Sequence, residues 1–459
     1  MRVKGLLPNF LIVHQVVSEN PIEFKSSDKG KNGNKGKNGN KGITIPELIK
    51  REAPELADGA TDTLYGLLVN GHLQTAYGSV RRFEKRDKVQ YKRMVLKYPH
   101  GGEGTVDFAV KDTGITKIKK KKEYMPANQP MFDMNLKIKY SYYSPDDPKL
   151  KSADTKPMLI LLHGLTGGSR ESYVRAVVHE ITTKYDFEAC VFNARGCCYS
   201  AITTPLLYNG GWTNDIRYCI NDLRKRFPNR KFYMMGFSLG ASIMTNYLGE
   251  ESDRTKIECA ISMSNPFDLF NSSYFINNTP MGSRFYSPAL GQNLLRMIRN
   301  HISVLEENPD FKAVLDQNLD KIRTVKQFDN LLTGPMFGYK NAEEYYKNAS
   351  SCKRIPGIRT PFVALHAMDD PIVGSDHLPI SQVKSNPYTM LLETSTGGHV
   401  GWFKDSSGKR WYTEPICKFL KAFHDEITVK GLKPDLNNAK LPNPKCESIA
   451  TTFPLKVVE

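Results

Sequence analysis

One short stretch of the chain combines a nucleophilic side chain with glycines at the spacing of a sharp turn. Gly236, Phe237, Ser238, Leu239 and Gly240 read Gly-x-Ser-x-Gly between an apolar run and a segment rich in small residues. A strand that turns abruptly into a helix exposes such a serine hydroxyl, and the glycines let strand and helix approach. The string alone is weak support, because a chain with 34 glycines can contain it by chance. In this context it predicts a nucleophilic serine for acyl transfer; the alternative is a helix-capping serine.

Two residues downstream of this serine have the types and positions that a serine nucleophile requires. A serine hydroxyl is a poor nucleophile until a general base removes its proton, and an acid orients that base. Asp370 follows the apolar run at 361–367, and His399 follows the apolar run at 388–394 and a pair of glycines. The order serine, acid, histidine is the chain order of nucleophiles on a strand–turn–helix. We therefore predict that His399 is the base and that Asp370 is the acid.

Two other aspartates compete with Asp370 for this role. Asp369 is its neighbour; we favour Asp370 because the Pro-Ile-Val that follows it suits a turn leading away from the strand. Asp268, after the strand that follows the nucleophile helix, is a rival whose ordinary role would be a helix cap. His366 lies within an apolar run and is expected to be a core histidine.

A reaction at a carbonyl also needs donors for the negative charge that develops on its oxygen. Two backbone N–H groups aimed at one point supply such an oxyanion hole. We expect one from Leu239, directly after the serine. The other is expected from Leu165, in the glycine-rich loop His163–Gly168 (HGLTGG), whose glycines let the backbone turn inward. The alternative for this loop is an ordinary flexible connection.

The segments that carry these residues alternate between strand and helix patterns. Continuous apolar runs indicate strands buried on both faces, and 3.6-residue periodicity indicates helices. The expected strands are 158–164, 188–196, 231–236, 257–264, 361–367 and 388–394, and the expected helices are 169–185 (with Ser169 as its cap), 212–227, 238–249 and 413–428. This alternation predicts an α/β fold with a mostly parallel central sheet flanked by helices.

Three regions with other patterns complete the expected organisation. Residues 1–42 are expected to be a flexible N-terminal segment, because the Lys/Gly/Asn repeat at 29–42 cannot bury enough apolar surface to fold. Residues 43–150 are expected to form a lead-in of helix and antiparallel strands (89–97, 105–110 and 137–143). Residues 151–459 form the catalytic core, in which about 267–355 lacks strand signals and is expected to be a helical cap insertion.

Charge and composition exclude several classes of function. The 459-residue chain is 40% hydrophobic and 24% charged, and 64 Lys and Arg against 48 Asp and Glu give +16. Much of the excess lies in the repeat at 29–42 and in the lysines at 117 and 119–122, which we interpret as solvated loops. No aromatic residues alternate with these charges, so no nucleic-acid partner is expected. The alternative for these lysines is peripheral contact with an anionic lipid surface.

The cysteines and the N-terminus bear on cofactors and location. The eight cysteines form no Cys-x-x-Cys pair and no Cys/His zinc spacing, which favours a reducing intracellular compartment and predicts no metal and no tight cofactor. The apolar N-terminal run is short and is interrupted by Pro8 and Asn9, so a secretory leader is not expected. No stretch approaches 18 apolar residues, and no transmembrane helix is expected.

Several longer strings resemble a known family. They are Asn70–Thr75 (NGHLQT), HGLTGG, Asn193–Gly196 (NARG), Gly211–Asp215 (GWTND), GFSLGA, Glu343–Tyr346 (EEYY), DDPI and GGHVGW. With these strings the chain resembles the α/β-hydrolase superfamily, within it the AB hydrolase 4 (YheT-like) family. The C-terminal strings SSGKRWY and FLKAFHDEIT look most like the fungal medium-chain fatty acid ethyl ester synthase/esterases.

This resemblance implies acyl transfer through an acyl-enzyme on Ser238. The expected substrates are a medium-chain acyl-CoA or acyl ester and ethanol, with CoA as a leaving group, so that ethanol yields an ethyl ester and water a free acid. A monoacylglycerol lipase or another lipid carboxylesterase is the alternative, and a catalytically idle lipid-binding scaffold is a third hypothesis. The expected location is the cytoplasm or the periphery of a lipid droplet or the mitochondrial outer membrane.

Overall fold

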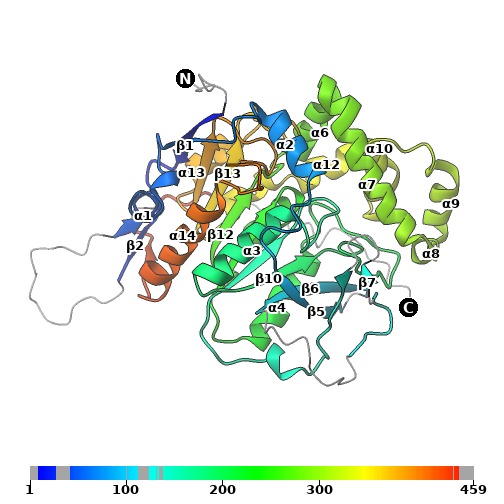
Figure 1. Ribbon diagram of the computed structural model, residues 1–459, viewed down its shortest axis with the longest axis horizontal. Coiled ribbons are helices and arrows are strands. Elements are labelled where there is room, and N and C mark those ends of the chain that lie inside the picture. Colours follow the sequence, from blue (N-terminus) through cyan, green and yellow to red (C-terminus); the bar gives the residue numbers. More distant parts are fainter. Residues whose placement is uncertain are drawn as a thin grey trace, which may run out of the picture.

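The computed structural model describes residues 9–26, 42–99, 101–111, 124–130, 132–133, 138–437 and 439–443 (Figure 1). A ten-stranded sheet runs through the described part of the chain. Its strands, in spatial order, are β4 (Thr61–Thr63), β1 (Phe10–Val17), β14 (Thr389–Thr394), β13 (Phe362–Ala367), β12 (Ile257–Met263), β11 (Phe232–Phe237), β9 (Met158–Leu162), β10 (Glu188–Asn193), β6 (Glu103–Val110) and β5 (Gln90–Lys97). The strands from β14 to β10 pair in parallel, and those at both ends pair antiparallel.

Most helices outside the insertion lie on the two faces of this sheet. They are α1 (Ile45–Glu52), α3 (Ser172–Lys184), α4 (Asn214–Arg226), α5 (Leu239–Glu251), α13 (Ile380–Ser385) and α14 (Thr413–Phe423), with short helical turns η1 (Pro54–Leu56), η2 (Pro148–Leu150), η3 (Ser252–Arg254) and η7 (His424–Thr428). α2 (Gly71–Val80) lies instead against the loops that follow β13 and β14. No helix in the described ranges is long and apolar enough to cross a membrane. This architecture confirms the predicted α/β fold with a mostly parallel sheet.

Alternate side chains of the central strands enter two separate hydrophobic cores. In β9, Met158, Ile160 and Leu162 face the core that also contains residues of α4, α5 and the helical insertion. Leu159 and Leu161 of the same strand face the core formed with α1, α3 and α14. Because successive strand residues point to opposite faces, a run that is apolar at every position fits a strand covered on both sides.

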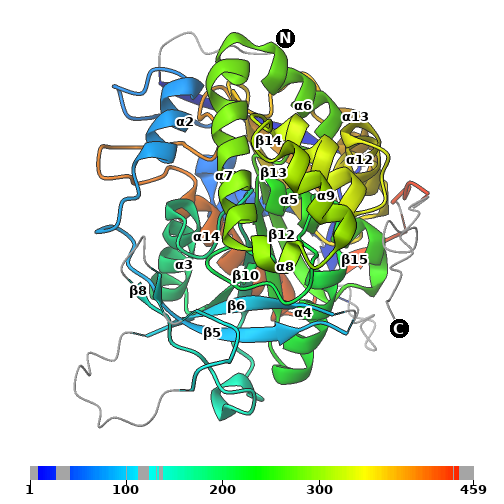
Figure 2. The same ribbon diagram turned by 90° about the vertical axis from the view of Figure 1, so that its right-hand side faces the viewer.

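A helical insertion separates β12 from β13, as the sequence predicts. It comprises α6 (Leu269–Asn278), the π-helix η4 (Gly282–Tyr286), α7 (Ser287–Asn300), α8 (Ile302–Leu305), α9 (Pro309–Asn318), α10 (Val325–Phe328), the π-helix η5 (Asp329–Thr333), α11 (Gly334–Met336), α12 (Ala342–Ala349) and the 3-10 helix η6 (Ser351–Gly357). Figure 2 shows α7, α8 and α9 of this insertion in front of the sheet strands.

The N-terminal part of the chain corrects one expectation. Residues 10–25, which fall within the expected flexible segment 1–42, form β1 and β2 (Glu23–Lys25). β1 pairs with β14, and β2 pairs with β15 (Lys433–Asp435) and β3 (Ile43–Thr44). The physical reason is burial, because Leu11 and Val13 are 0% and 1% exposed.

The other expected boundaries, 43–150 and 151–459, stay predictions. The expected strand at 137–143 is reduced to β8 (Ile138–Lys139), which pairs with β7 (Phe132–Asp133). Residues 28–41 of the Lys/Gly/Asn region and the lysines at 117–122 lie outside the described residues.

Candidate active site

Ser238 occupies a sharp turn between β11 and α5. Its backbone has φ 51° and ψ −122°, a conformation that non-glycine residues rarely adopt. A Cβ atom added to Gly240 would lie 2.3 Å from the carbonyl oxygen of His163, and one added to Gly236 would lie 2.6 Å from the Cα of Ala241. Both glycines are therefore required by the close approach of the helix to the ends of the strands. The predicted strand–turn–helix is present at the expected residues.

His399 lies between Ser238 and Asp370. Its Nε2 is 2.9 Å from the Oγ of Ser238, and its Nδ1 is 2.7 Å from the Oδ2 of Asp370. A carboxylate can only accept, so Nδ1 carries the ring proton and Nε2 is left to accept from the serine hydroxyl. This arrangement can remove the serine proton during attack on a carbonyl and hold it as imidazolium beside a carboxylate.

The carboxyl group of Asp370 is buried and fully hydrogen-bonded. The residue is 2% exposed, and its Oδ1 accepts from the backbone N–H groups of Ile372 at 2.8 Å and Val373 at 3.0 Å. Burial alone would raise its pKa, but the charge and hydrogen bond of His399 outweigh this and hold the pKa of Asp370 below its usual range. Asp370 is therefore ionised at neutral pH.

The competing residues have other contacts. Asp369 accepts from the Thr396 hydroxyl and from the Gly398 N–H, both at 2.8 Å, so it shapes the loop before His399 without touching the imidazole. Asp268 accepts from the Asn271 N–H and caps α6. His366 is 0% exposed, and its Nε2 lies 2.9 Å from the Gly374 carbonyl oxygen, as expected for a core histidine.

Sequence reasoning missed the contribution of α2 to the position of the histidine loop. The backbone N–H of His399 donates to the Thr75 hydroxyl at 2.8 Å, and that hydroxyl donates to the Gly71 carbonyl at 2.7 Å. A Cβ on Gly71 would lie 1.9 Å from the Asp369 carbonyl oxygen, so this position also requires glycine. The one available signal was the string NGHLQT, which ends at Thr75.

The two expected oxyanion donors lie beside the serine. A Cβ added to Gly164 would be 3.3 Å from the Ser238 Cβ, which places the HGLTGG loop against the nucleophile. The loop is held by Tyr173, whose hydroxyl accepts from the Gly164 N–H at 3.0 Å, and by Tyr208, whose hydroxyl accepts from the Thr166 N–H at 2.9 Å. Within the described residues the N–H groups of Leu165 and Leu239 make no hydrogen bond, so they are available to a ligand.

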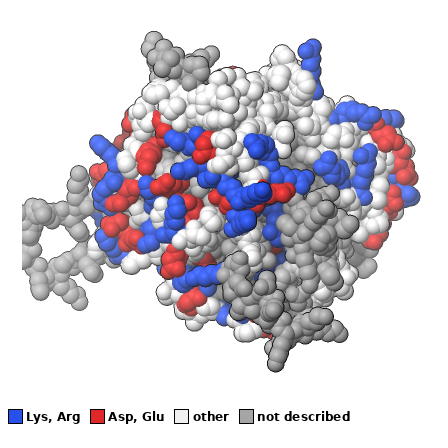
Figure 3. Space-filling model, viewed as in Figure 1, with Lys and Arg blue, Asp and Glu red and all other residues white. Residues whose placement is uncertain are grey.

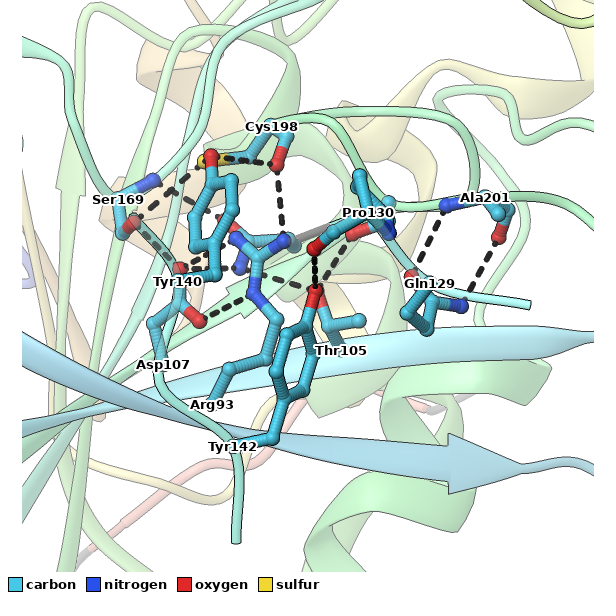
Figure 4. Close-up of polar contacts among 12 residues, drawn as sticks. Arg93, Thr105, Asp107, Gln129, Pro130, Tyr140, Tyr142, Ser169, Cys198 and Ala201 are labelled. Carbon is cyan, nitrogen blue, oxygen red and sulfur yellow. Dashed lines mark hydrogen bonds and ion pairs between the residues drawn. The ribbon is translucent and has the colours of Figure 1, made fainter. Parts of the chain in front are cut away.

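A buried polar network supports the far end of this loop (Figure 4). Arg93 and Asp107 form a two-point ion pair with distances of 2.6 and 2.7 Å, and both side chains are 1% exposed. The Ser169 hydroxyl donates to Asp107 at 2.6 Å, and the Ser169 N–H donates to the Asn193 side chain at 3.0 Å. The expected role of Ser169 as the cap of α3 is therefore wrong. That helix begins at Ser172, and the hydroxyl of Ser169 is hydrogen-bonded to Asp107 of β6.

Two of the longer sequence strings meet in a second buried ion pair. Arg195, from NARG, contacts Asp215, from GWTND, at 2.6 and 2.9 Å. The side chains are 1% and 4% exposed. A guanidinium and a carboxylate buried together in this way connect the loop after β10 to the first turn of α4.

Ser238 and His399 open onto a cavity of about 1400 Å³. The catalytic side contributes Leu165, Leu239 and Val400. The insertion contributes a largely apolar wall made of Leu269, Ile276, Leu290, Leu294, Met297, Phe328, Leu332, Met336 and Phe337. One buried acid, Asp329, stands in this wall. A cavity of this size and lining suits a long apolar substrate that ends at a carbonyl beside the serine.

Comparison with known proteins identifies the family. The model of the alpha/beta hydrolase fold matches residues 157–405. The chain belongs to the α/β-hydrolase family. Within the family, this hydrolase is 81% identical over 453 residues to a protein named monoacylglycerol lipase from Saccharomyces cerevisiae, with 99% of both chains covered. It is 32% identical over 414 residues to the medium-chain fatty acid ethyl ester synthase/esterase 2 of the same yeast, covering 84% of this chain and 91% of that relative. An esterase structure from Pyrococcus furiosus covers 75% of this hydrolase and 95% of the esterase, at 12% identity and a TM-score of 0.42.

These comparisons confirm the predicted superfamily and correct the predicted activity. The chain is an ester hydrolase. The expectation of acyl transfer from acyl-CoA to ethanol is wrong, because the relative with 81% identity over nearly the full length is named a lipase and the ester synthase shares only 32%. The physical reason for the error is that FLKAFHDEIT, one of the two C-terminal strings behind this expectation, lies in α14 and η7, whose residues do not line the cavity beside Ser238.

Proposed function

We propose that this hydrolase cleaves monoacylglycerols to a fatty acid and glycerol. The observation that carries the proposal is the 81% identity, over 99% of both chains, to a yeast protein named monoacylglycerol lipase. The cavity supports it, because an apolar wall for one acyl chain adjoins Ser238 and His399. A lipid with a single acyl chain fits such a site with its ester carbonyl at the serine.

In the proposed mechanism Ser238, His399 and Asp370 act as a catalytic triad. The Ser238 Oγ attacks the ester carbonyl carbon while His399 Nε2 takes the serine proton, and Asp370 stabilises the imidazolium. The Leu165 and Leu239 N–H groups hold the oxygen that becomes negative, and each such donor contributes about 3 kcal/mol to stabilisation of the transition state. The bond to the glycerol oxygen then breaks, and that oxygen receives the proton from His399.

The acyl-enzyme is released by water. His399 takes a proton from the water, whose oxygen attacks the acyl carbon; the bond to Ser238 breaks and the serine regains its proton. The second proton of the water stays on the new carboxyl group and passes to solvent, so the fatty acid leaves as its carboxylate and the enzyme returns to its starting state. The N-terminus of α5, at which Leu239 is the first residue, adds a favourable field for both oxyanions.

The test is hydrolysis of defined lipids by the purified full chain. We expect glycerol release from 1-oleoylglycerol, a loss of at least about 10⁴-fold in kcat in Ser238→Ala, and labelling of wild type but not of Ser238→Ala by a fluorophosphonate probe. Phosphatidylcholine and trioleoylglycerol are supplied in parallel as esters of the same acid. Release of oleate from either of these without cleavage of 1-oleoylglycerol would contradict the proposal.

We also infer a reducing intracellular location. Seven cysteines lie in the described ranges and all are free thiols. Burial raises the pKa of Cys190, Cys219 and Cys259, so these thiols stay protonated and unreactive. Labelling of the endogenous protein with a thiol reagent under denaturing conditions, before and after reduction, tests this; all thiols are expected to react before reduction.

A further inference from the structure

Exposed apolar side chains are concentrated on two segments that are nearly free of charge. Residues 64–80 contain no Lys, Arg, Asp or Glu, and residues 269–286 contain only Arg284. Among the described residues, ten large hydrophobic side chains are strongly exposed, and seven of them belong to these segments or their ends: Leu67, Val69, Leu73, Val80, Tyr274, Met281 and Phe285. We call these seven residues the apolar rim.

The two segments lie against each other in the fold. The His72 ring of α2 stacks on the Tyr286 ring of η4 with centroids 5.8 Å apart, and the Tyr286 hydroxyl lies 3.0 Å from His72 Nδ1. Leu73 and Phe285 are the chain neighbours of these two rings. Figure 3 shows that the upper edge of the molecule, over α2 and α6, is almost free of charged side chains, whereas charges of both signs cover the surface to its left.

The exposed face of α2 is the reverse of an ordinary surface helix. Leu73, Ala76 and Val80 follow one another at intervals of three and four residues, so they share one face, and all three are exposed. A surface helix normally carries polar residues on the face that it presents to water. Contiguous apolar patches on a protein surface are typical of sites that contact another protein or lipid.

The inner faces of the same elements line the cavity that holds Ser238. Thr75, Gly78 and Ser79 of α2 and Ser272 and Ile276 of α6 belong to its wall. The apolar rim therefore lies on segments whose other residues line the cavity that holds Ser238.

Basic side chains flank the rim. Residues 81–88, directly after α2, carry five cations, Arg81, Arg82, Lys85, Arg86 and Lys88, against two acids, Glu84 and Asp87, and Asp87 pairs with Arg86. Arg284 is exposed within η4. The Arg81 guanidinium lies 5.3 Å from the Tyr77 ring centroid and 5.7 Å from that of Phe83, which holds this charge at the surface beside α2. An apolar patch bordered by cations is complementary to acyl chains beneath anionic headgroups.

We propose that the apolar rim docks this hydrolase on an anionic lipid surface, so that the ester passes from that surface into the cavity. The passage of the ester rests on the proposed function, whereas the docking does not. The partner that we assign to the rim is the lipid surface, and a second copy of the chain covering the same patch is the contrary outcome of the test.

The test is flotation of full-length Ser238→Ala protein with vesicles, because this variant cannot consume the lipid. The vesicles contain phosphatidylcholine and phosphatidylserine at about 7:3. We expect the protein to float with them, and Leu67→Glu/Phe285→Glu in the same background to reduce the bound fraction at least about tenfold. Leu67 and Phe285 are 72% and 58% exposed, so their replacement removes little packing.

The matched control is Val429→Glu/Leu436→Glu, two apolar residues that are 67% and 51% exposed on other elements. It adds the same charge and is expected to bind as the parent does. Equal binding of the two double variants, with equal urea midpoints, would overturn the proposal. The proposal would also be overturned if the parent protein did not float, was a dimer by light scattering, and became a monomer in Leu67→Glu/Phe285→Glu. Failure of wild type to cleave 1-oleoylglycerol would leave the flotation result standing, so the two proposals fail separately.

Discussion

Asp369 and Asp370 are adjacent in the chain but hold different parts of the site. Asp370 contacts the His399 ring, whereas Asp369 contacts Thr396 and Gly398. We expect Asp370→Asn to lower kcat by at least about 100-fold, because an amide no longer fixes the ring tautomer or stabilises the imidazolium. In Asp369→Asn the amide oxygen can still accept one hydrogen bond from the loop before His399, so we expect kcat to fall less than about tenfold.

The measurement is kcat and KM on a soluble short-chain ester, with both variants assayed beside wild type. The pair is a matched control, since each replaces one carboxylate of the same dipeptide by an isosteric amide. A larger loss in Asp369→Asn than in Asp370→Asn would exchange their proposed roles.

Asp329 is a buried acid in the cavity wall. It accepts from the Thr333 hydroxyl at 2.6 Å and from the Tyr346 hydroxyl at 2.7 Å, and burial raises its pKa from 3.8 to about 6 despite these bonds. Between these pH values the folded state holds a proton that the unfolded state has lost. Stability therefore falls as pH rises through this window and is constant above it.

Asparagine does not titrate, so we expect that the stability of Asp329→Asn does not fall as pH rises through this window. A pKa difference of about two, at ~1.4 kcal/mol per pKa unit, predicts that the free energy of unfolding of the variant relative to wild type increases by up to ~3 kcal/mol between about pH 4 and pH 7. Urea unfolding at both pH values measures it. A relative free energy that does not change with pH would show that Asp329 is ionised in the folded state at both values.

At the scale of elements, β1 completes the half of the sheet that carries the histidine loop. Val13 is 1% exposed and pairs in register with Thr394, five residues before His399. We expect Val13→Asp to reduce the free energy of unfolding by ~3 kcal/mol or more, because it buries an unpaired charge in the core. His14→Ser changes the next residue, whose side chain is 65% exposed, and should cost at most ~1 kcal/mol.

Urea unfolding of both variants gives the comparison. Equal midpoints for Val13→Asp and His14→Ser would mean that β1 contributes nothing to the folded core.

Most central elements could be predicted from local pattern, and the exceptions share a cause. The run 158–164 is apolar at nearly every position and became β9, and the turn at Ser238 needed only neighbouring residues. β1 was missed because its residues were assigned, together with the Lys/Gly/Asn repeat at 29–42, to one flexible segment, and because its partner β14 lies at the other end of the chain. Local patterns do not report long-range partners.

The candidate site divides in the same way. Ser238, Asp370 and His399 follow recognisable strands, so their meeting could be predicted. The contact of Thr75 with the His399 backbone could not, because 324 residues separate them. Ser169 was misassigned because its sequence position suits a helix cap, while its actual partner, Asp107, is 62 residues upstream.

At the scale of the whole molecule, the formal charge of +16 combines with the apolar rim. Charge attraction to a lipid surface is screened by salt, with a Debye length of about 10 Å at 0.1 M, whereas burial of apolar side chains is not. We expect flotation with vesicles that contain phosphatidylserine to weaken when NaCl rises from about 0.05 to about 0.5 M. The smaller fraction that floats with pure phosphatidylcholine should not weaken.

Bound fractions at the two salt concentrations measure both contributions. Salt-independent binding to both vesicle types would assign the docking to the rim alone, and complete release in high salt would assign it to charge alone.

The position of β1 also has a consequence for synthesis of the enzyme. Ile12 donates its N–H to Ser395, 383 residues later in the chain. At about 5–20 residues per second, a ribosome needs on the order of 20–80 s to make the partner of a strand that it produced first. During that time FLIV, the first half of β1, can pair with the three-residue strand β4 but not with β14, so we expect it to be a binding site for chaperones on the nascent chain. In the proposed mechanism the same delay keeps the emerging enzyme inactive, because the loop of His399 follows β14 in the chain.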